Sequence, residues 1–274
     1  MQKENEKVDL HMHSSESDGL LKPEELIKVG LQYSLRAISI TDHDTISGIK
    51  PAIIMAEKKS LELVPGFEIS MDDNNREIHL LGYYPYYIND LAIILEKYRL
   101  ARFERMEQMT NRLKRLNIKI SFSEVLDAAR GAAPGRLHLA RLLVKKKYAE
   151  SINKAFTLYL NKGTDIFVPR KLMTLKKTMS VMHDVKAIPV LAHPGFYSMD
   201  IIEKLLLNGL KGIEVFHPEH SPEDKRILRK YAQDKGLLIT GGTDFHGDNI
   251  SIAYPNNNTI DYIYLEQLKR YRYQ

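Results

Sequence analysis

Histidines and carboxylates follow the ends of short apolar stretches in this sequence, beginning with His11 and His13 after Val8-Asp9-Leu10. Side chains alternate along a β-strand, so the His-x-His spacing points both imidazoles to one face. Two imidazoles on one face can bind one metal ion. Such a pair also occurs in purely structural roles. The metal interpretation therefore depends on whether further ligand types recur along the chain.

Ligand-type side chains do recur after later apolar stretches, and nearly every one lies at or just beyond a predicted strand end. Histidines scattered through a core would not follow strand ends, which favours a metal site. The carboxyl ends of strands are also where an α/β barrel builds its active site. The candidates that join His11 and His13 are Asp18, His43, Glu68, His79, His193, Asp244 and His246.

Their spacing suggests three metal positions. The first is formed by His11, His13, Glu68 and Asp244; in the second Glu68 bridges to an ion held by His79 and His193; the third is formed by Asp18, His43 and His246. The chain has no cysteine, which excludes thiolate ligands and disulfides. Imidazole and carboxylate suit Zn²⁺, Mn²⁺ or Fe²⁺. We therefore expect two or three divalent ions.

The elements that must position these ligands alternate between strands and helices. Strands are predicted at 7–12, 36–41, 61–64, 77–83, 188–192, 212–216 and 237–240, and helices at 23–33, 47–59, 175–185, 200–207 and 222–235. Alternating βα units predict a parallel sheet. We expect an α/β fold, a distorted (β/α)7 TIM-like barrel with a helical insertion subdomain. A doubly wound open sheet is the alternative.

The stretch 89–169 interrupts this alternation and predicts helices at 91–116, 122–129, 137–147 and 152–160. We expect residues 1–88 and 170–274 to form the barrel and 89–169 to cap it. From Arg99 to Lys177 the chain has 19 Lys and Arg but 6 Asp and Glu, a surplus of 13, whereas the whole chain carries +5. The remainder thus carries −8. A local basic surplus is often only a solvated surface, but here it also favours an anionic substrate.

Composition limits the other classes of function. Hydrophobic residues make up 43% of the 274 residues, and no apolar run approaches the length of a membrane span. The N-terminus MQKENEKVDL has no apolar segment of the secretory type. We expect a cytoplasmic protein that makes no use of a membrane.

Several motifs together resemble the polymerase and histidinol phosphatase (PHP) family of metal-dependent phosphoesterases. They are VDLHMHSSESDG, ITDHD, PGFE, IHLLGY, LAHPG, EVFHPEHS and GGTDFHG. Residues 133–141, Ala-Pro-Gly-Arg-Leu-His-Leu-Ala-Arg, resemble the Gly-Arg-Pro-His segment of the family branch of nucleoside 3′,5′-bisphosphate phosphatases and 5′-to-3′ exoribonucleases. Leu137 stands where that branch usually has Pro. The resemblance implies a distorted barrel of seven βα units with two or three divalent ions.

The expected reaction is hydrolysis of a phosphate monoester of a small nucleotide, with short RNA as a second substrate, by a metal-bridged hydroxide. Asp244 and Glu68 are the catalytic carboxylates, with Asp244 relaying a proton, and His217 or His220 protonates the leaving oxygen. Arg136 is the expected phosphate clamp, because its planar fork matches phosphate oxygens. Arg102 and Arg105, on one helix face, are further substrate contacts or a solvated surface.

Two alternatives remain open at this stage. One is a histidinol-phosphate or other small-molecule phosphatase, against which the basic insertion argues. The other is a nucleic-acid-binding module with a vestigial metal site, against which the intact ligand set argues. The oligomeric state does not follow from the sequence.

Overall fold

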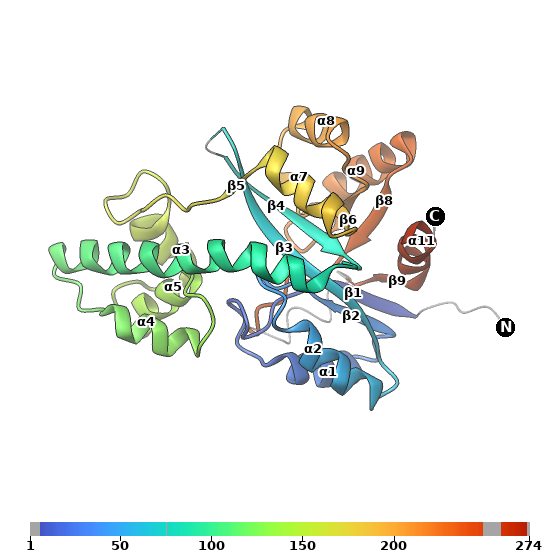
Figure 1. Cartoon of the computed structure of the whole chain (residues 1–274). Coiled ribbons are helices and arrows are strands. Elements are labelled where there is room, and N and C mark those ends of the chain that lie inside the picture. The colour runs from blue at the N-terminus through green and yellow to red at the C-terminus, as the bar shows by residue number, and fades with distance from the viewer. Residues whose placement is uncertain (1–5, 75, 249–258, 273–274) are drawn as a thin grey trace.

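The centre of the protein is a curled sheet surrounded by helices, seen in the computed structural model, which describes residues 6–74, 76–248 and 259–272 (Figure 1). Its strand order is β8-β7-β6-β4-β3-β2-β1-β9, and β5 pairs with β3. The strands are β1 (Lys7–Met12), β2 (Ala37–Ile40), β3 (Glu62–Asp73), β4 (Arg76–Tyr83), β5 (Met173–Thr174), β6 (Ile188–Leu191), β7 (Gly212–Phe216), β8 (Leu238–Gly241) and β9 (Ile260–Asp261).

Side-chain bonds close the sheet into a nearly complete barrel. Asp9, fully buried in β1, accepts hydrogen bonds from the backbone N–H of Thr243 at 3.0 Å and from its hydroxyl at 2.6 Å, just after β8. Met12 and Phe245 form an isolated β-bridge nearby. A buried carboxylate needs such donors, so Asp9 joins the first and last barrel strands. The prediction of a barrel is therefore confirmed, and the alternative of a doubly wound open sheet is not.

The fourth barrel strand departs from the prediction of a parallel sheet, which is wrong at this point. β4 runs antiparallel to both β3 and β6. Only residues 74 and 75 separate β3 from β4, which is too short for a crossover helix. Asn74 has φ of 53°, a left-handed conformation that Asn tolerates in tight turns. The chain therefore makes a hairpin where the sequence suggested one more βα unit.

Helices surround the sheet close to the predicted ranges. Ser221, for example, accepts a hydrogen bond from the backbone N–H of Asp224 and so caps α9, which begins with Pro222. The pair β9 and α11 was not predicted. Around the barrel lie α1 (Pro23–Gln32), α2 (Ile49–Glu57), α7 (Leu175–Asp184), the 3₁₀ turn η2 (Pro194–Phe196), α8 (Met199–Leu207), α9 (Pro222–Lys235) and α11 (Tyr262–Arg272).

The insertion is helical, as predicted, and has a hydrophobic cluster of its own. Leu91 and Leu95, near the start of its long helix, pack into the barrel core, whereas Met106 and Met109 pack with Leu139 in a separate cluster. We propose on this basis that 89–169 is a subdomain between barrel segments 1–88 and 170–274. Its helices are α3 (Ile88–Arg115), α4 (Phe122–Ala129), α5 (Arg136–Lys145), α6 (Ile152–Ala155) and the π-helix η1 (Phe156–Leu160).

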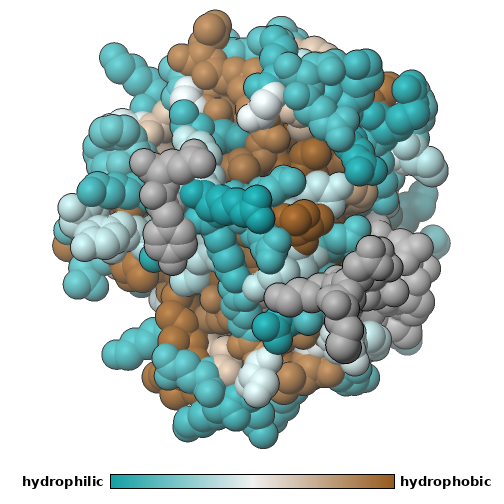
Figure 2. All heavy atoms as spheres, turned by 90° about the vertical axis from the view of Figure 1, so that its right-hand side faces the viewer, coloured by the Kyte–Doolittle hydropathy of each residue, from teal (hydrophilic) through white to brown (hydrophobic). Residues whose placement is uncertain are grey.

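In Figure 1, α4 and α5 lie at the far end of α3 from β1 and β2. No helix in the described part of the chain is long and apolar enough to cross a bilayer. The face that carries the C-terminal helix mixes hydrophilic and hydrophobic residues (Figure 2).

Candidate metal centre and the pocket beside it

Glu68 lies at the centre of a cluster of imidazoles. It is fully buried in β3, and its carboxylate oxygens lie 3.0 Å from Nδ1 of His43 and 3.1 Å from Nδ1 of His79. The other imidazole nitrogens within 3.5 Å of this carboxylate belong to His11, His13 and His193. Neither oxygen of Glu68 has a hydrogen-bond partner among the described residues. One buried carboxylate thus faces five imidazoles, an arrangement that suits a bridging metal ligand.

Asp244 completes the first predicted group. Its Oδ1 lies 3.3 Å from Nε2 of His11 and 3.0 Å from Nε2 of His13, and its Oδ2 lies 3.5 Å from Nε2 of His217. Asp244 has φ of 49°, a left-handed conformation that is uncommon for a residue with a side chain. The loop after β8 holds this backbone so that the carboxylate reaches His11 of β1 and His13 just after it.

The third predicted group is also assembled. Ligand atoms of His13, Asp18, His43 and His246 all lie within 4.8 Å of one another. Two smaller groups that meet the same limit are His11, His13 and Glu68, and His43, Glu68 and His79. His13 and His43 therefore each face two groups, which the spacing of the sequence did not indicate.

The electrostatics of the cluster favour ionised carboxylates. Burial acts to raise the pKa of Glu68, but the His43 and His79 imidazoles hold that pKa well below its usual range. Burial acts to lower the pKa of His79, but the Glu68 carboxylate raises it to about 10. Burial lowers the pKa of His13 to about 4. The buried negative charge attracts cations.

These donors pass a simple test of fit for divalent ions. The ring atoms Nδ1 of His13, Nδ1 of His43 and Nδ1 of His193 are buried without a hydrogen-bond partner, as are both Glu68 oxygens. Unpaired buried polar atoms are costly. Metal coordination by nitrogen and oxygen would satisfy them.

A second ring of buried groups, which the sequence analysis did not single out, orients the cluster. Glu214, in β7, lies 3.0 Å from Nδ1 of His11 and accepts a hydrogen bond from the backbone N–H of His193 at 2.9 Å. Asp42 accepts bonds from the hydroxyls of Ser14 and Ser17, both at 2.6 Å. The acidic residue inside the apolar run Gly-Ile-Glu-Val-Phe was a usable signal for Glu214.

The two candidate leaving-group acids differ in their surroundings. Nδ1 of His220 lies 2.9 Å from the carbonyl of Val215, and its Nε2 accepts a bond from the backbone N–H of Gly195. Both nitrogens of His220 are thus engaged. Nε2 of His217 has no hydrogen-bond partner in the described part of the chain and faces Asp244. This geometry favours His217 over His220.

A pocket of about 210 Å³ joins the cluster to the insertion. Its barrel side includes Asp18, His43, Glu77, His79 and His246. The same lining contains four guanidinium groups, from Arg102, Arg105, Arg136 and Arg170. Three of them were predicted substrate contacts, and Arg170 was missed because its partners, Asp44 and Glu77, lie far from it along the chain. The pocket lining therefore combines imidazoles and carboxylates with a group of four cationic side chains.

Carboxylates outside the metal candidates hold the arginines in place. Arg170 pairs with Asp44, and its Nη1 lies 3.1 Å from Oε1 of Glu77, while Nη2 of Arg136 lies 3.5 Å from the same carboxylate. Burial lowers the pKa of Arg105 and that of Arg170 to about 10. Both guanidiniums therefore remain charged at neutral pH. Within residues 6–74, 76–248 and 259–272, Nη2 of Arg105 has no hydrogen-bond partner, which leaves a donor for an anion.

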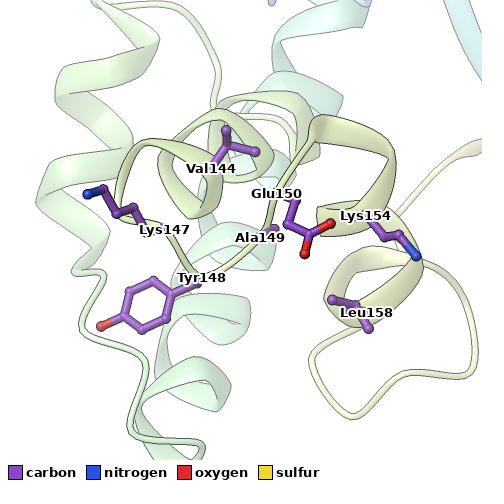
Figure 3. A pocket seen from close by; sticks show the side chains of 7 residues that line it. All are labelled: Val144, Lys147, Tyr148, Ala149, Glu150, Lys154 and Leu158. Atoms are coloured by element: carbon purple, nitrogen blue, oxygen red, sulfur yellow. The ribbon is translucent and has the colours of Figure 1, made fainter.

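Another hollow, of about 600 Å³, lies in the insertion and has different chemistry (Figure 3). Lys147 and Lys154 line it together with one carboxylate, that of Glu150. No imidazole is among its described lining residues. Four of the candidate metal ligands, Asp18, His43, His79 and His246, line the smaller pocket instead.

A barrel whose strand ends gather imidazoles and carboxylates beside a cationic pocket defines a metal-dependent phosphoesterase. The family model described as "PHP domain" matches residues 9–166, and the chain belongs to this family. The chain is thus an enzyme, and the non-enzymatic alternative does not hold.

Relatives extend the comparison over most of the chain. It is 32% identical to the 5′-3′ exoribonuclease Rnm of Escherichia coli over 87% of this chain and 84% of that one. It is 30% identical to the 3′,5′-nucleoside bisphosphate phosphatase of Chromobacterium violaceum, over 87% of each. The solved structure of a metal-dependent phosphoesterase from Bifidobacterium adolescentis has a TM-score of 0.86 and 26% identity, over 95% of this chain and 94% of that one.

Proposed function

We propose that this enzyme removes a phosphate from nucleoside 3′,5′-bisphosphate and also cleaves short RNA from its 5′ end. The observation that carries the proposal is the group of four arginines in the same pocket as four of the candidate metal ligands, Asp18, His43, His79 and His246. A simple monoester has one phosphate for the metal centre and leaves the arginines unused. A substrate with a second phosphate nearby would use the metal centre for one phosphate and the arginines for the other.

The similarity to relatives named for a bisphosphate phosphatase and an exoribonuclease supports the same proposal. Both names imply a nucleotide with more than one phosphate group. Histidinol phosphate, the alternative substrate, has a single phosphate. Nothing in the group of four arginines favours it.

The nine predicted ligands would hold two or three divalent ions, of Mn, Fe or Zn, with Glu68 as the bridge. When bound, such ions neutralise phosphoryl charge and lower the pKa of water to near neutrality. Asp244 faces His11 and His13 and would hold the proton of the attacking water. His217 presents its free Nε2 beside Asp244 and would protonate the leaving oxygen.

Arg136 would hold the phosphate that is not cleaved. Its side chain is 26% exposed, and its guanidinium lies over the rings of Phe156 at 5.6 Å and Phe167 at 5.9 Å. These aromatic faces restrict the side chain, so less conformational freedom is lost when an anion binds. A charge-assisted contact of this kind contributes about 1.5–3 kcal/mol.

The test is the substrate selectivity of Arg136→Ala. We expect kcat/KM for nucleoside 3′,5′-bisphosphate to fall by about ten- to a hundredfold, with an aryl phosphate monoester nearly unaffected. Arg99→Ala is the matched control, because Arg99 is an insertion arginine paired with Glu96 outside the pocket lining. Equal losses on both substrates would assign Arg136 to the reacting phosphate. No loss on either would remove the support for a bisphosphate substrate.

A further inference from the structure

Arg141, on helix α5 of the insertion, reaches the barrel loops that carry two of the candidate metal ligands. Its Nη1 donates a hydrogen bond to the backbone carbonyl of Asp18 at 2.7 Å. Its Nη2 donates to the backbone carbonyl of His246 at 3.3 Å and pairs with the carboxylate of Asp248. One guanidinium thus joins positions that are 123 and 105 residues away along the chain.

The two loops are also bonded to each other at the same place. The backbone N–H of Leu20 donates to the carbonyl of His246 at 2.9 Å. Gly247 has φ of 89°, and a Cβ there would lie 2.7 Å from Cβ of Leu20. The approach therefore requires glycine. Arg141 lies across a junction that is already close, and adds a charged donor to it.

Because the two carbonyls belong to Asp18 and His246, fixing them also fixes the directions of the Asp18 and His246 side chains. The direction of a Cα–Cβ bond depends on the backbone of its own residue, so movement of the Asp18 or His246 peptide would turn the ligand atom away. Their side chains now lie 3.5 Å apart, Oδ1 to Nε2. The planar fork of arginine sets the separation of two acceptors, which a lysine ammonium cannot do.

The helix that carries Arg141 is itself held firmly. Leu139, Ala140 and Leu143 of α5 are buried in the cluster of the insertion. The backbone N–H of Gly135, just before the helix, donates to Nδ1 of His138 at 3.0 Å. The arginine side chain is only 17% exposed. Its position is therefore set by the packing of the insertion.

We infer that Arg141 is a positioning residue for the metal position formed by Asp18, His43 and His246, so that the insertion is structurally part of the metal centre. This inference rests on the proposed ligand roles of Asp18 and His246. It differs from the substrate role of the arginine pocket, because Arg141 is not among the described residues that line that pocket.

The experiment measures bound metal directly. Wild type, Arg141→Ala and Arg141→Lys are stripped, titrated with Mn²⁺, and analysed for ions per chain and for the affinity of each ion. Groups that orient metal ligands typically change metal affinity by about 10–100-fold. We expect Arg141→Ala to bind the ion at the position of Asp18, His43 and His246 that much less tightly, with the other ions unchanged and kcat recovered at high Mn²⁺. Arg141→Lys should fall between the two.

Arg130→Ala is the matched control. Arg130 also extends from the insertion to the same loop, but it donates to the carbonyl of Leu20, which is not a ligand residue. It should bind Mn²⁺ as the wild type does. If Arg141→Ala unfolds, Arg141→Lys carries the test.

Three outcomes contradict the inference in distinguishable ways. If both Arg141 variants bind every ion with wild-type affinity, the role of Arg141 is overturned but the proposed metal centre is not. An equal loss in Arg130→Ala shows general loosening of the loop and also overturns it. A wild-type protein that binds no Mn²⁺, Fe²⁺ or Zn²⁺ overturns the proposed metal centre itself.

Discussion

The barrel and the insertion supply opposite charges to one pocket, and they do so by different structural means. In the barrel, the imidazoles and carboxylates lie in strands or the loops after them, as Glu68 and Asp244 do. In the insertion, Arg102 and Arg105 project from one face of α3, and Arg136 is the first residue of α5. A sheet brings strand ends together whatever side chains they carry. A helix face reaches a site only where the helix happens to pack.

The cationic half depends on the barrel for its own stability. Asp44 follows β2 with φ of 51° and is 2% exposed. It pairs with Arg170 and lies 3.6 Å from Nε of Arg102. A buried guanidinium without a counter-charge would be strongly destabilising. The barrel therefore carries the candidate metal ligands and also supplies the carboxylate that neutralises these arginines.

The largest expected effect comes from Glu68→Gln, which tests the barrel half. The amide removes a charge that faces five imidazoles, so ions should be lost and turnover should fall with them. Groups that merely orient metal ligands change affinity or activity by about 10–100-fold, and a bridging ligand should exceed about a hundredfold. Metal analysis and kcat are measured on the same samples.

Glu57→Gln is the control for charge alone, because Glu57 is an exposed residue at the end of α2. It should retain metal and turnover. If Glu68→Gln keeps its ions and a near-normal kcat, Glu68 is not a bridge, and the contrast between the two halves of the pocket loses its basis.

A smaller effect is expected for Glu214→Gln, which leaves every proposed ligand in place. Glu214 lies 3.0 Å from Nδ1 of His11, which fixes the ring and strengthens Nε2 as a donor. We expect metal affinity to fall by about 10–100-fold, with kcat recovered when metal is in excess. Metal titration of the variant measures this.

Glu203→Gln serves as the comparison for Glu214→Gln. Glu203 bonds to Tyr231 and Lys235 away from the cluster. Glu203→Gln should therefore bind metal with wild-type affinity. A Glu214→Gln protein with wild-type affinity would mean that His11 is oriented by β1 alone.

The same contrast explains what the sequence could predict. His11 at the end of β1, His13 just after it and Asp244 after β8 could be grouped because closed barrels bring strand ends together. The hairpin between β3 and β4 was missed because only the residues near Asn74 signal it, and Glu77 to Tyr83 reads as an ordinary strand. Only the distances between ligand atoms in the folded chain show that His13 and His43 each face two groups of candidate ligands. Spacing along the sequence cannot give this.

The insertion was less predictable in function than in structure. Its helix ranges followed from apolar periodicity, and α4 has the predicted bounds. Whether Arg102 and Arg105 face substrate or solvent depends on how α3 packs across the barrel, which is a tertiary property. Arg141 and Arg170 were missed for the same reason. Arg141 donates to carbonyls 123 and 105 residues away, and Arg170 donates to the Glu77 carboxylate 93 residues away.

The smallest expected effect tests whether the insertion can be weakened without disturbing the metal centre. Ser121 caps α4, because its hydroxyl accepts a hydrogen bond from the backbone N–H of Glu124 at 3.2 Å. The carboxylate of Glu124 in turn accepts a hydrogen bond from the backbone N–H of Ser121. Loss of such a cap costs about 1 kcal/mol. Ser121→Ala should therefore lower the free energy of unfolding by about that amount in urea.

The metal content of Ser121→Ala should equal that of the wild type, because α4 provides none of the proposed ligands and a loss of this size leaves α5 packed. Ser123→Ala controls for removal of a serine hydroxyl, since Ser123 lies inside α4 and contacts the cap only through its own hydroxyl at 3.0 Å. Lower metal affinity in Ser121→Ala would show that the centre responds to the whole insertion. The barrel and the insertion would then act as one unit, and the role of Arg141 would be one contact among many.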